Sequence, residues 1–163
     1  MPQIVRDADD VVQPADLLAR VSYRIRLLQI AAYKSFEKVV TDFGTAPRYY
    51  GLLKIIEANP GIHQSRLAEA IFLDRSSVVP IVEALRREGW IERRATENDR
   101  RIRRLFLLPE GKRKLRLLEQ QVDRHETAMT AGLSGTETAT LLGLLDRIDA
   151  NLRSALAAEA TRP

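Results

Sequence analysis

Residues 93–104 read RRATENDRRIRR and hold six arginines against two acidic residues. Their local net charge of +4 equals that of the whole chain, so the other residues balance to zero. The apolar runs GWI at 89–91 and LFLL at 105–108 flank the stretch. Two strands joined by a charged tip give this pattern, which predicts a basic β-hairpin. Its tip would suit a nucleic-acid groove, where guanidinium groups meet phosphates. The alternative is a solvated charge run on a surface hairpin.

Composition sets the broad class of the protein. With 163 residues, 45% hydrophobic and 29% charged, the chain fits one globular domain, or one compact domain carrying extensions. A pI near 9.7 with a net charge of only +4 indicates a localised basic site for a polyanionic partner. The absence of cysteine excludes disulfides, thiolate metal ligands and thiol-based redox sensing on this chain.

The ends of the chain and its apolar runs bear on localisation. The start, MPQIVRDADD, is acidic and has no apolar segment, so we do not expect a signal peptide. No apolar run approaches the roughly 20 residues that cross a bilayer. We therefore expect a cytoplasmic protein without a membrane partner.

Helical periodicity dominates the first third of the chain. Residues 1–14 show none, and we read them as a loose arm. From Ala15 to about Thr41, apolar residues recur at steps of three and four, which predicts one helix. Gly44 interrupts the pattern, and Pro47 suits the first turn of a second helix that runs to Asn59.

A helix-turn-helix motif is predicted next. A short helix within Ile62–Ile71 is followed by a turn at 72–73 and by Asp74 in an N-cap position, where its carboxylate would accept from a backbone N–H. The following helix continues through Leu85, with Gly89 at the C′ position. The basic hairpin comes directly after this helix and would be the wing of a winged helix-turn-helix.

The C-terminal third predicts two more helices. One runs from Lys112 to about Met129, and the last carries an apolar stripe from Leu141 to Leu156. The stripes at both ends of the chain have no partner in a small winged core, so we expect them to pair with each other and with a second copy. The predicted dimer core comprises residues 17–32, 115–122 and 141–156; an intramolecular bundle in a monomer is the alternative.

The segment LDRSSVVPIVEALRREGWIERRATENDRRIRRLFLLPEGK, residues 73–112, resembles the MarR family of bacterial transcriptional regulators. Asp-Arg-Ser, an amphipathic helix, Gly with a hydrophobic residue, and Asp-x-Arg at a hairpin tip follow in the family's order, and the resemblance extends over about 15–157. It implies a mainly α fold with a small β-hairpin wing: an arm at 1–14, a dimerisation helix at 15–44, a winged helix-turn-helix DNA-binding domain at 45–108 and C-terminal dimerisation helices at 109–163.

The resemblance also implies a function, that of a homodimeric, sequence-specific DNA-binding regulator. Most such proteins are repressors, and many are released from DNA by small phenolic or anionic ligands. We expect double-stranded DNA with a pseudo-palindromic operator as partner, and no cofactor or metal. His63 and His125 show no metal-ligand spacing, and no phosphate loop or nucleophile motif occurs, so an enzyme is not expected. The alternative function is a winged-helix architectural or protein-interaction module without sequence-specific DNA binding.

Recognition-helix candidates lie near the start of the helix beginning at Arg75. Burial of Val78, Val82 and Leu85 would leave its other early positions facing outward, where recognition helices reach bases. Arg75 can pair with guanine or phosphate, or remain a surface ion pair with Asp74 or Glu69. The serines can bond phosphate or a base edge, or serve the helix start. Val79 and Pro80 are apolar where many relatives carry polar residues, and they could contact a thymine methyl group. These outward positions are Arg75, Ser76, Ser77, Val79 and Pro80.

The wing and the first motif helix supply the remaining DNA-binding candidates. Asp99 and Arg101 match the family's Asp-x-Arg, which implies that the carboxylate holds the tip while arginine enters the minor groove; Arg100 competes for that role. We expect the other wing arginines, at 93, 94, 103 and 104, to follow phosphates or stay solvated. Gln64 and Ser65 could donate to phosphate, although His63 stands where relatives carry a capping serine or threonine.

Effectors of the family sit between the dimer helices and the winged domain. An aromatic-plus-arginine lining would suit an aromatic carboxylate or a related anionic thioester. Each candidate could instead be an ordinary packing aromatic or surface charge. The positions expected near that crevice are Tyr23, Arg26, Tyr33, Tyr49, Tyr50 and His125.

Overall fold

A computed structural model describes residues 14–96 and 99–160. The chain divides into two compact units, Met1–His125 and Glu126–Pro163. The first unit holds a three-stranded antiparallel sheet and the helices packed on it, and the second holds the last helix. The predicted class, mainly α with a small β wing, is confirmed.

The N-terminal helical segment is two helices, α1 (Ala15–Leu18) and α2 (Val21–Val39). The prediction of one helix from Ala15 to about Thr41 is therefore wrong. Arg20 separates the two because its backbone is extended, with φ −85° and ψ 123°. Its N–H closes a tight turn onto the carbonyl of Leu17 at 3.1 Å, while its own carbonyl accepts the first bond of α2 from Arg24. The apolar stripe continues across the break, so periodicity alone did not mark it.

The first part of the winged domain begins where Pro47 was expected to start a helix. A 3₁₀ turn, η1 (Ala46–Tyr49), carries this proline in its first turn and leads into α3 (Tyr50–Ala58). The short helix expected within Ile62–Ile71 is confirmed as α4, which spans Gln64–Ala70, and Ile62–His63 before it forms strand β1. Strand β1 was not predicted, and it pairs with a later strand at Ile62↔Leu105 and His63↔Arg104.

The second part of the domain contains the recognition-helix candidate and the wing. Helix α5 spans Arg75–Arg87, strand β2 spans Ile91–Thr96 and strand β3 spans Asp99–Leu107. The strands lie in the order β1-β3-β2, so the predicted hairpin exists and β1 extends it by one strand. Cross-strand pairs run from Ile91↔Leu107 to Ala95↔Arg103, with an irregularity before Thr96.

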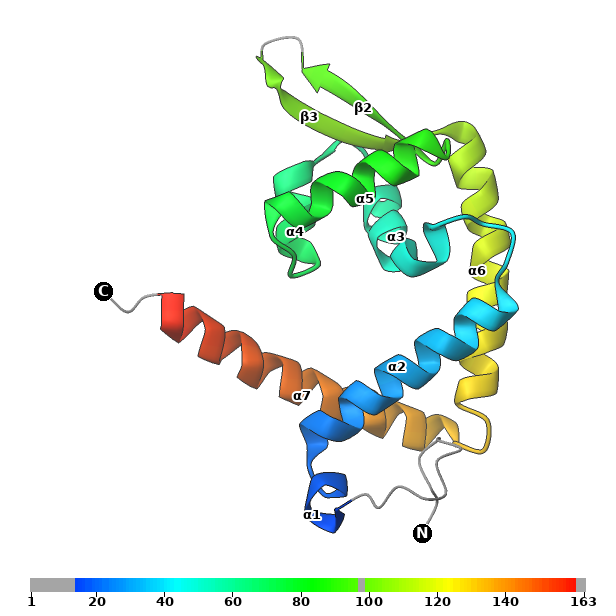
Figure 1. The fold of residues 1–163 in the computed structure, drawn as a ribbon, viewed down its shortest axis with the longest axis vertical. Helices are drawn as coiled ribbons and strands as arrows, with labels where there is room; N and C mark the ends of the chain where they lie inside the picture. Colours follow the sequence, from blue (N-terminus) through cyan, green and yellow to red (C-terminus); the bar gives the residue numbers. More distant parts are fainter. Residues whose placement is uncertain (1–13, 97–98, 161–163) are drawn as a thin grey trace. The chain divides into compact units, whose positions relative to one another are not determined.

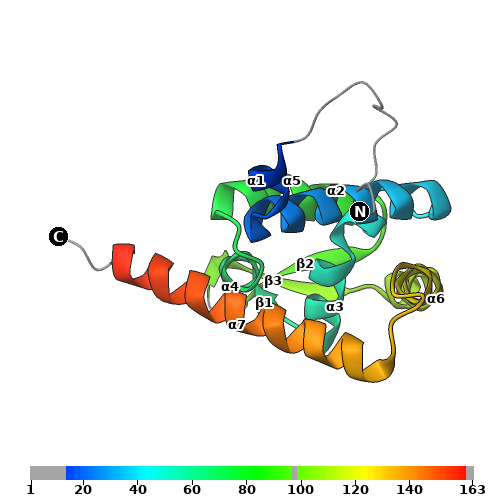
Figure 2. The same cartoon turned by 90° about the horizontal axis from the view of Figure 1, so that it is seen from below.

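The core of the first unit lies between this sheet and the helices. Helices α3, α4 and α5 gather around the strands (Figure 1), and the view from below shows α3 and α4 beside them (Figure 2). Trp90 is 2% exposed at the base of the hairpin and packs with Phe43. The fully enclosed side chains come from all of these elements and from α6: Leu53, Ile56, Leu67, Val78, Val82, Leu85, Ile91, Leu105, Leu115 and Leu118.

Helix α6 (Pro109–Met129) packs its first half into that core. Leu115 and Leu118 are both fully buried within this single chain, so assigning them to a dimer core was wrong. Gly111 lies against the backbone of Trp90; a Cβ at this position would sit 2.0 Å from the Trp90 carbonyl oxygen. Glycine is therefore required where α6 leaves the wing, because a backbone carbonyl cannot move aside as a side chain does.

Helix α7 (Gly135–Ala160) forms the second unit and begins with a capping box. The Ser134 hydroxyl accepts from the Glu137 N–H at 3.2 Å, and the Glu137 carboxylate accepts from the Ser134 N–H at 2.8 Å. Backbone and side-chain hydrogen bonds from Ser134 lower the pKa of Glu137, which keeps the cap charged. The leucines predicted as a stripe on this helix are exposed within the single chain: Leu141, Leu145, Leu152 and Leu156.

Candidate nucleic-acid interface

Helix α5 presents its first two turns to solvent, as the sequence predicted. Val78, Val82 and Leu85 are fully buried against the sheet and the neighbouring helices. This stripe fixes the rotation of the helix, since residues at steps of three and four share one face. The residues left outside are all exposed, and they are the five DNA-binding candidates of this helix: Arg75, Ser76, Ser77, Val79 and Pro80.

The start of α5 differs from the expected side-chain cap. Asp74 occupies the N-cap position, but its carboxylate makes no cap hydrogen bond. Its backbone carbonyl instead accepts from the N–H groups of Ser77 at 3.0 Å and Val78 at 3.2 Å. Glu69, an alternative partner for Arg75, pairs with Arg66 at 2.8 Å. Arg75 itself is exposed at the start of the helix, so its guanidinium is accessible to a ligand.

Helix α4 begins at Gln64, with Ser65 as its second residue and both half-buried. His63 is the N-cap residue and makes no side-chain cap bond, as its departure from a capping serine or threonine suggested. The first N–H groups of α4 therefore lack a side-chain cap. Donation from Gln64 and Ser65 to phosphate remains a prediction.

The wing arginines fall into different classes. Arg103 is exposed, and the guanidinium of Arg104 donates to the Gly61 carbonyl at 3.3 Å. Arg94 is 60% exposed, contacts Glu92 at 2.5 Å and lies 4.4 Å from the centre of the Phe106 ring. The expectation that these arginines follow phosphates or stay solvated is wrong for Arg93, whose side chain is only 20% exposed.

Arg93 joins the wing to the recognition helix. Its guanidinium contacts the carboxylate of Glu83 on α5, which also pairs with Arg86 at 3.1 Å. The hydrogen bond from Arg86, together with the charge of Arg93, lowers the pKa of Glu83. Sequence reasoning missed this pair, because Glu83 and Arg93 meet only once β2 packs on α5. This ion pair therefore holds strand β2 of the wing against α5.

The tip of the wing carries three of the predicted DNA-binding residues. Residues 97–98 lie outside the described residues. The backbone of Asp99, Arg100 and Arg101 begins β3, with Thr96 paired to Asp99. The roles predicted for the side chains of Asp99, Arg100 and Arg101 also lie outside what the structure describes, so they remain predictions.

One of the ligand-site candidates lies in a polar cluster that links α2 to η1. The Tyr33 hydroxyl donates to Glu37 at 2.5 Å and accepts from Arg48 Nε at 2.6 Å. The Arg48 guanidinium lies 5.2 Å from the centre of the Tyr33 ring and 3.5 Å from Glu37. Desolvation and the hydrogen bond to Glu37 raise the pKa of Tyr33. Arg48 was missed, although it directly precedes two candidate tyrosines.

The other ligand-site candidates are spread over the first unit. His125 packs edge-on against Phe36, with ring centres 5.2 Å apart. Tyr49 and Tyr50 pack against the core, and the Tyr50 hydroxyl lies 3.3 Å from a Glu119 oxygen. On α2, Tyr23 is half-buried and Arg26 is exposed.

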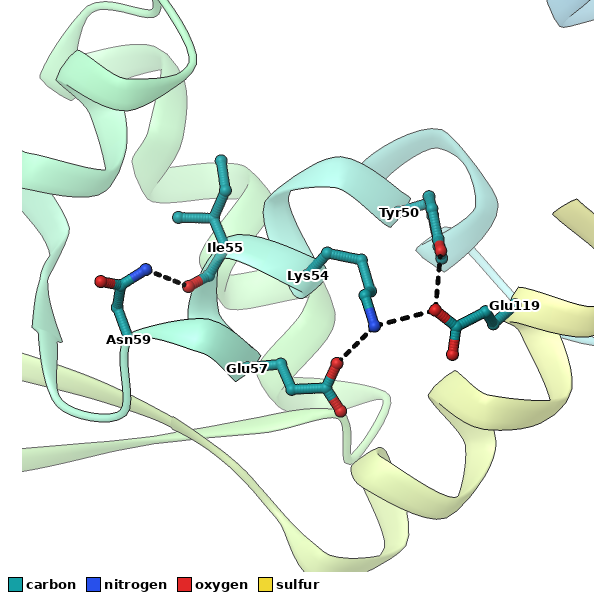
Figure 3. A network of polar contacts seen from close by, with 6 residues as sticks. All are labelled: Tyr50, Lys54, Ile55, Glu57, Asn59 and Glu119. Carbon is teal, nitrogen blue, oxygen red and sulfur yellow. Dashed lines mark hydrogen bonds and ion pairs between the residues drawn. The ribbon is translucent and has the colours of Figure 1, made fainter. Parts of the chain in front are cut away.

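A second polar network holds α3 to α6 (Figure 3). Lys54 Nζ lies 2.6 Å from Glu57 and 2.9 Å from Glu119, and Tyr50 adds its hydroxyl to the same Glu119 oxygen. The hydrogen bonds that Lys54 donates to Glu57 and Glu119 raise the pKa of Lys54, and the bond that Glu119 accepts from Lys54 lowers the pKa of Glu119. The charges of this network are paired within the chain, so we assign the network a structural role rather than a ligand-binding one.

Two other kinds of site are absent from the described residues, 14–96 and 99–160. These residues contain no cluster of three histidine, aspartate or glutamate side chains arranged to hold a metal ion. Within the same ranges, no helix combines the length and hydrophobicity that a membrane span requires.

The known proteins that resemble this chain are transcriptional regulators. A sequence model of the MarR family matches residues 43–102. A Thauera aromatica protein assigned as a transcriptional regulator for the hcr operon is 39% identical over 133 residues, 81% of this chain and 80% of its own length. The PcaV regulator of Streptomyces coelicolor, solved with its natural ligand, is 30% identical with a TM-score of 0.74, covering 85% of this chain and 97% of PcaV. The repressor CouR on a 23-mer DNA duplex is 26% identical with a TM-score of 0.79, covering 85% and 99%.

Proposed function

This chain belongs to the MarR family of winged-helix, DNA-binding transcriptional regulators, and we propose that it is a homodimeric repressor that binds a pseudo-palindromic operator with sequence preference. The observation that carries this proposal is the exposed start of α5. Two turns of this helix project polar, basic and apolar groups while a buried stripe holds its other face. A helix held in this way can enter the major groove of double-stranded DNA.

The remaining DNA-binding candidates have supporting roles in this proposal. Gln64 and Ser65 at the start of α4 donate to phosphate, and Arg103 follows the backbone from the wing. Arg101 enters the minor groove, with Arg100 as the competing residue and Asp99 holding the tip. CouR, which resembles this chain over 85% of its length, was solved on a DNA duplex, which supports the same use of the fold here.

A homodimer accounts for the exposed apolar residues near both ends of the chain. Val21 is 58% exposed and Leu28 is 59% exposed on α2, and Leu152 is 59% exposed on α7. Apolar stripes of this length are normally covered in a soluble protein, and a second copy supplies a matching surface. A dimer also places two α5 helices for two half-sites, so a change in their spacing weakens both contacts together.

An aromatic or anionic effector completes the proposal. Tyr33 and Arg48 offer a phenol and a guanidinium 2.6 Å apart at the junction of α2 and η1. A carboxylate could replace Glu37 as the partner of Arg48, since the pair is more than half exposed. PcaV was solved with its natural ligand, which supports a ligand site in this fold. Tyr23, Arg26, Tyr49, Tyr50 and His125 remain the other candidates for the lining.

Fluorescence anisotropy tests DNA binding directly. The probe is a labelled duplex from the region upstream of the protein's own gene, beside a shuffled duplex of equal length, at two salt concentrations. A preference of about a thousandfold supports a sequence-specific regulator. Equal, salt-sensitive binding to both would instead favour an architectural protein, and no binding would favour a protein-interaction module.

The effector is tested on the same complex. Benzoate, 4-hydroxybenzoate and 4-hydroxycinnamate are titrated against the protein–DNA complex, with cyclohexanecarboxylate as a non-aromatic control. Release by an aromatic acid, abolished in Arg48→Gln and retained in Arg116→Gln at an exposed arginine of α6, supports the site. Release that Arg48→Gln leaves unchanged would contradict it.

A further inference from the structure

Three residues of α5 form a small face that is more apolar than a groove-binding surface needs to be. Ser76, Val79 and Pro80 stand at positions i, i+3 and i+4, so they share one side of the helix. All three are exposed, Val79 by 44%. The stripe of Val78, Val82 and Leu85 is buried on the other side, so core packing does not account for this face.

Pro80 lies inside the helix, where proline is costly. It has no N–H, so it cannot donate the helical hydrogen bond to the carbonyl of Ser76, and its ring crowds that carbonyl. Val79 is β-branched and also a weak helix former. Because both side chains are exposed, burial within the chain does not offset this loss of helix stability. The combination therefore points to a contact made with a partner.

The charges of this helix and of the wing favour DNA as the partner. Arg75 begins the helix directly after Asp74, Arg103 is exposed on the wing, and the carboxylate of Glu83 on α5 is neutralised by Arg86 and Arg93. An apolar protein partner would place these guanidinium groups against uncharged surface. In the major groove, they meet phosphates, and the apolar surface displayed by a base pair there is the C5-methyl group of thymine.

We propose that Val79 and Pro80 read a thymine methyl group in each operator half-site, so that Val79 is a specificity-determining residue. The inference rests on the proposed function, because it requires a preferred DNA sequence. Burying about one methyl group corresponds to roughly a fourfold change in affinity. Val79 and Pro80 have no side-chain hydrogen-bonding group, so uracil, which pairs as thymine does and lacks only the methyl, isolates the contact.

The experiment starts with the full chain and a library of random duplexes. The enriched duplex is remade with each thymine replaced singly by deoxyuridine, and affinities are measured by anisotropy. At one thymine of each half-site, deoxyuridine weakens wild-type binding about fourfold. Val79→Ala reduces the difference between the two duplexes, because only Pro80 then contacts the methyl group, while Val79→Ile keeps it. Val39→Ala, which trims a similarly exposed valine on α2, also keeps it.

A second variant separates contact from folding. Pro80→Ala restores an N–H for the Ser76 carbonyl, so it raises the melting temperature while weakening operator binding and reducing the uracil effect. The outcomes distinguish the two proposals. Enrichment without a uracil effect, or a uracil effect that is undiminished in Val79→Ala, overturns the inference and leaves the proposed function standing. Failure to enrich any sequence overturns the proposed function and this inference with it.

Discussion

The ammonium nitrogen of Lys54 on α3 lies 2.9 Å from a carboxylate oxygen of Glu119 on α6. The same nitrogen lies 2.6 Å from Glu57, so one cation neutralises two acids (Figure 3). Helix α3 packs in the winged core, and α6 leads out of it. The pair therefore ties the first half of α6 to α3.

Replacing Lys54 should lower stability modestly. The side chains of Lys54 and Glu119 are 35% and 37% exposed, which limits the strength of the pair. Lys54→Met is expected to lower the free energy of unfolding by about 0.5–1 kcal/mol in urea titrations. Lys112→Met, at an exposed lysine of α6, serves as the control. Equal losses in the two variants would show that the pair contributes nothing.

Acid should weaken the same contact. The hydrogen bond from Lys54 lowers the pKa of Glu119 below its ordinary value of 4.5, so the folded state binds this proton less tightly than the unfolded chain. Its stabilisation is complete above about pH 4.5 and is lost as the pH falls through the folded-state pKa. The drop in melting temperature from pH 7 to pH 3.5 should be smaller in Glu119→Gln than in wild type. An identical drop would exclude the effect.

Two wing arginines should differ in their response to salt. Arg93 pairs with Glu83 inside the chain, whereas Arg103 is exposed. Arg103→Gln is expected to lower the slope of log affinity against log salt by about 0.9 for each phosphate that the protein no longer neutralises. Arg93→Gln should leave that slope unchanged and lower the free energy of unfolding by about 1–2 kcal/mol. A reduced slope in Arg93→Gln would mean that Arg93 binds phosphate.

The turn before α5 contains a strained residue. Phe72 has φ +54°, the one positive value at a non-glycine among residues 14–96 and 99–160. A Cβ in this region costs about 1–2 kcal/mol, and the Phe72 side chain is 56% exposed. Phe72→Gly should therefore be more stable than Phe72→Ala by about 1 kcal/mol in thermal unfolding. The order normally found at exposed sites, with alanine the more stable, would contradict this backbone assignment.

The features that the sequence predicted are those that depend on the spacing of apolar residues along a short segment. The stripe of Val78, Val82 and Leu85 has helical spacing, so α5 was predicted. The apolar runs at 89–91 and 105–108 flank the arginine-rich stretch, so the hairpin was predicted as well. Strand β1 was missed because two residues are too short to show a period. The break at Arg20 carries neither glycine nor proline, so no local signal marked it.

The parts of the site that sequence missed depend on tertiary contacts. Arg93 belongs to a run of similar arginines, and only the packing of β2 on α5 separates it from Arg103 by placing Glu83 beside it. The pairing of Arg48 with Tyr33 likewise requires η1 to lie beside α2. Asp74 was placed correctly at the N-cap, yet its carboxylate makes no cap bond, because backbone bonds to its carbonyl serve the helix start.

Hydroxyl-radical footprinting of the full chain on the region upstream of its own gene tests the central claim most directly. A homodimer that presents two α5 helices should protect one short region with two symmetric half-sites, centred about one helical turn apart or a multiple of it. Arg75→Ala should remove the protection at both half-sites together. Uniform protection along the fragment, or a single unpaired half-site, would contradict a homodimeric, sequence-specific regulator.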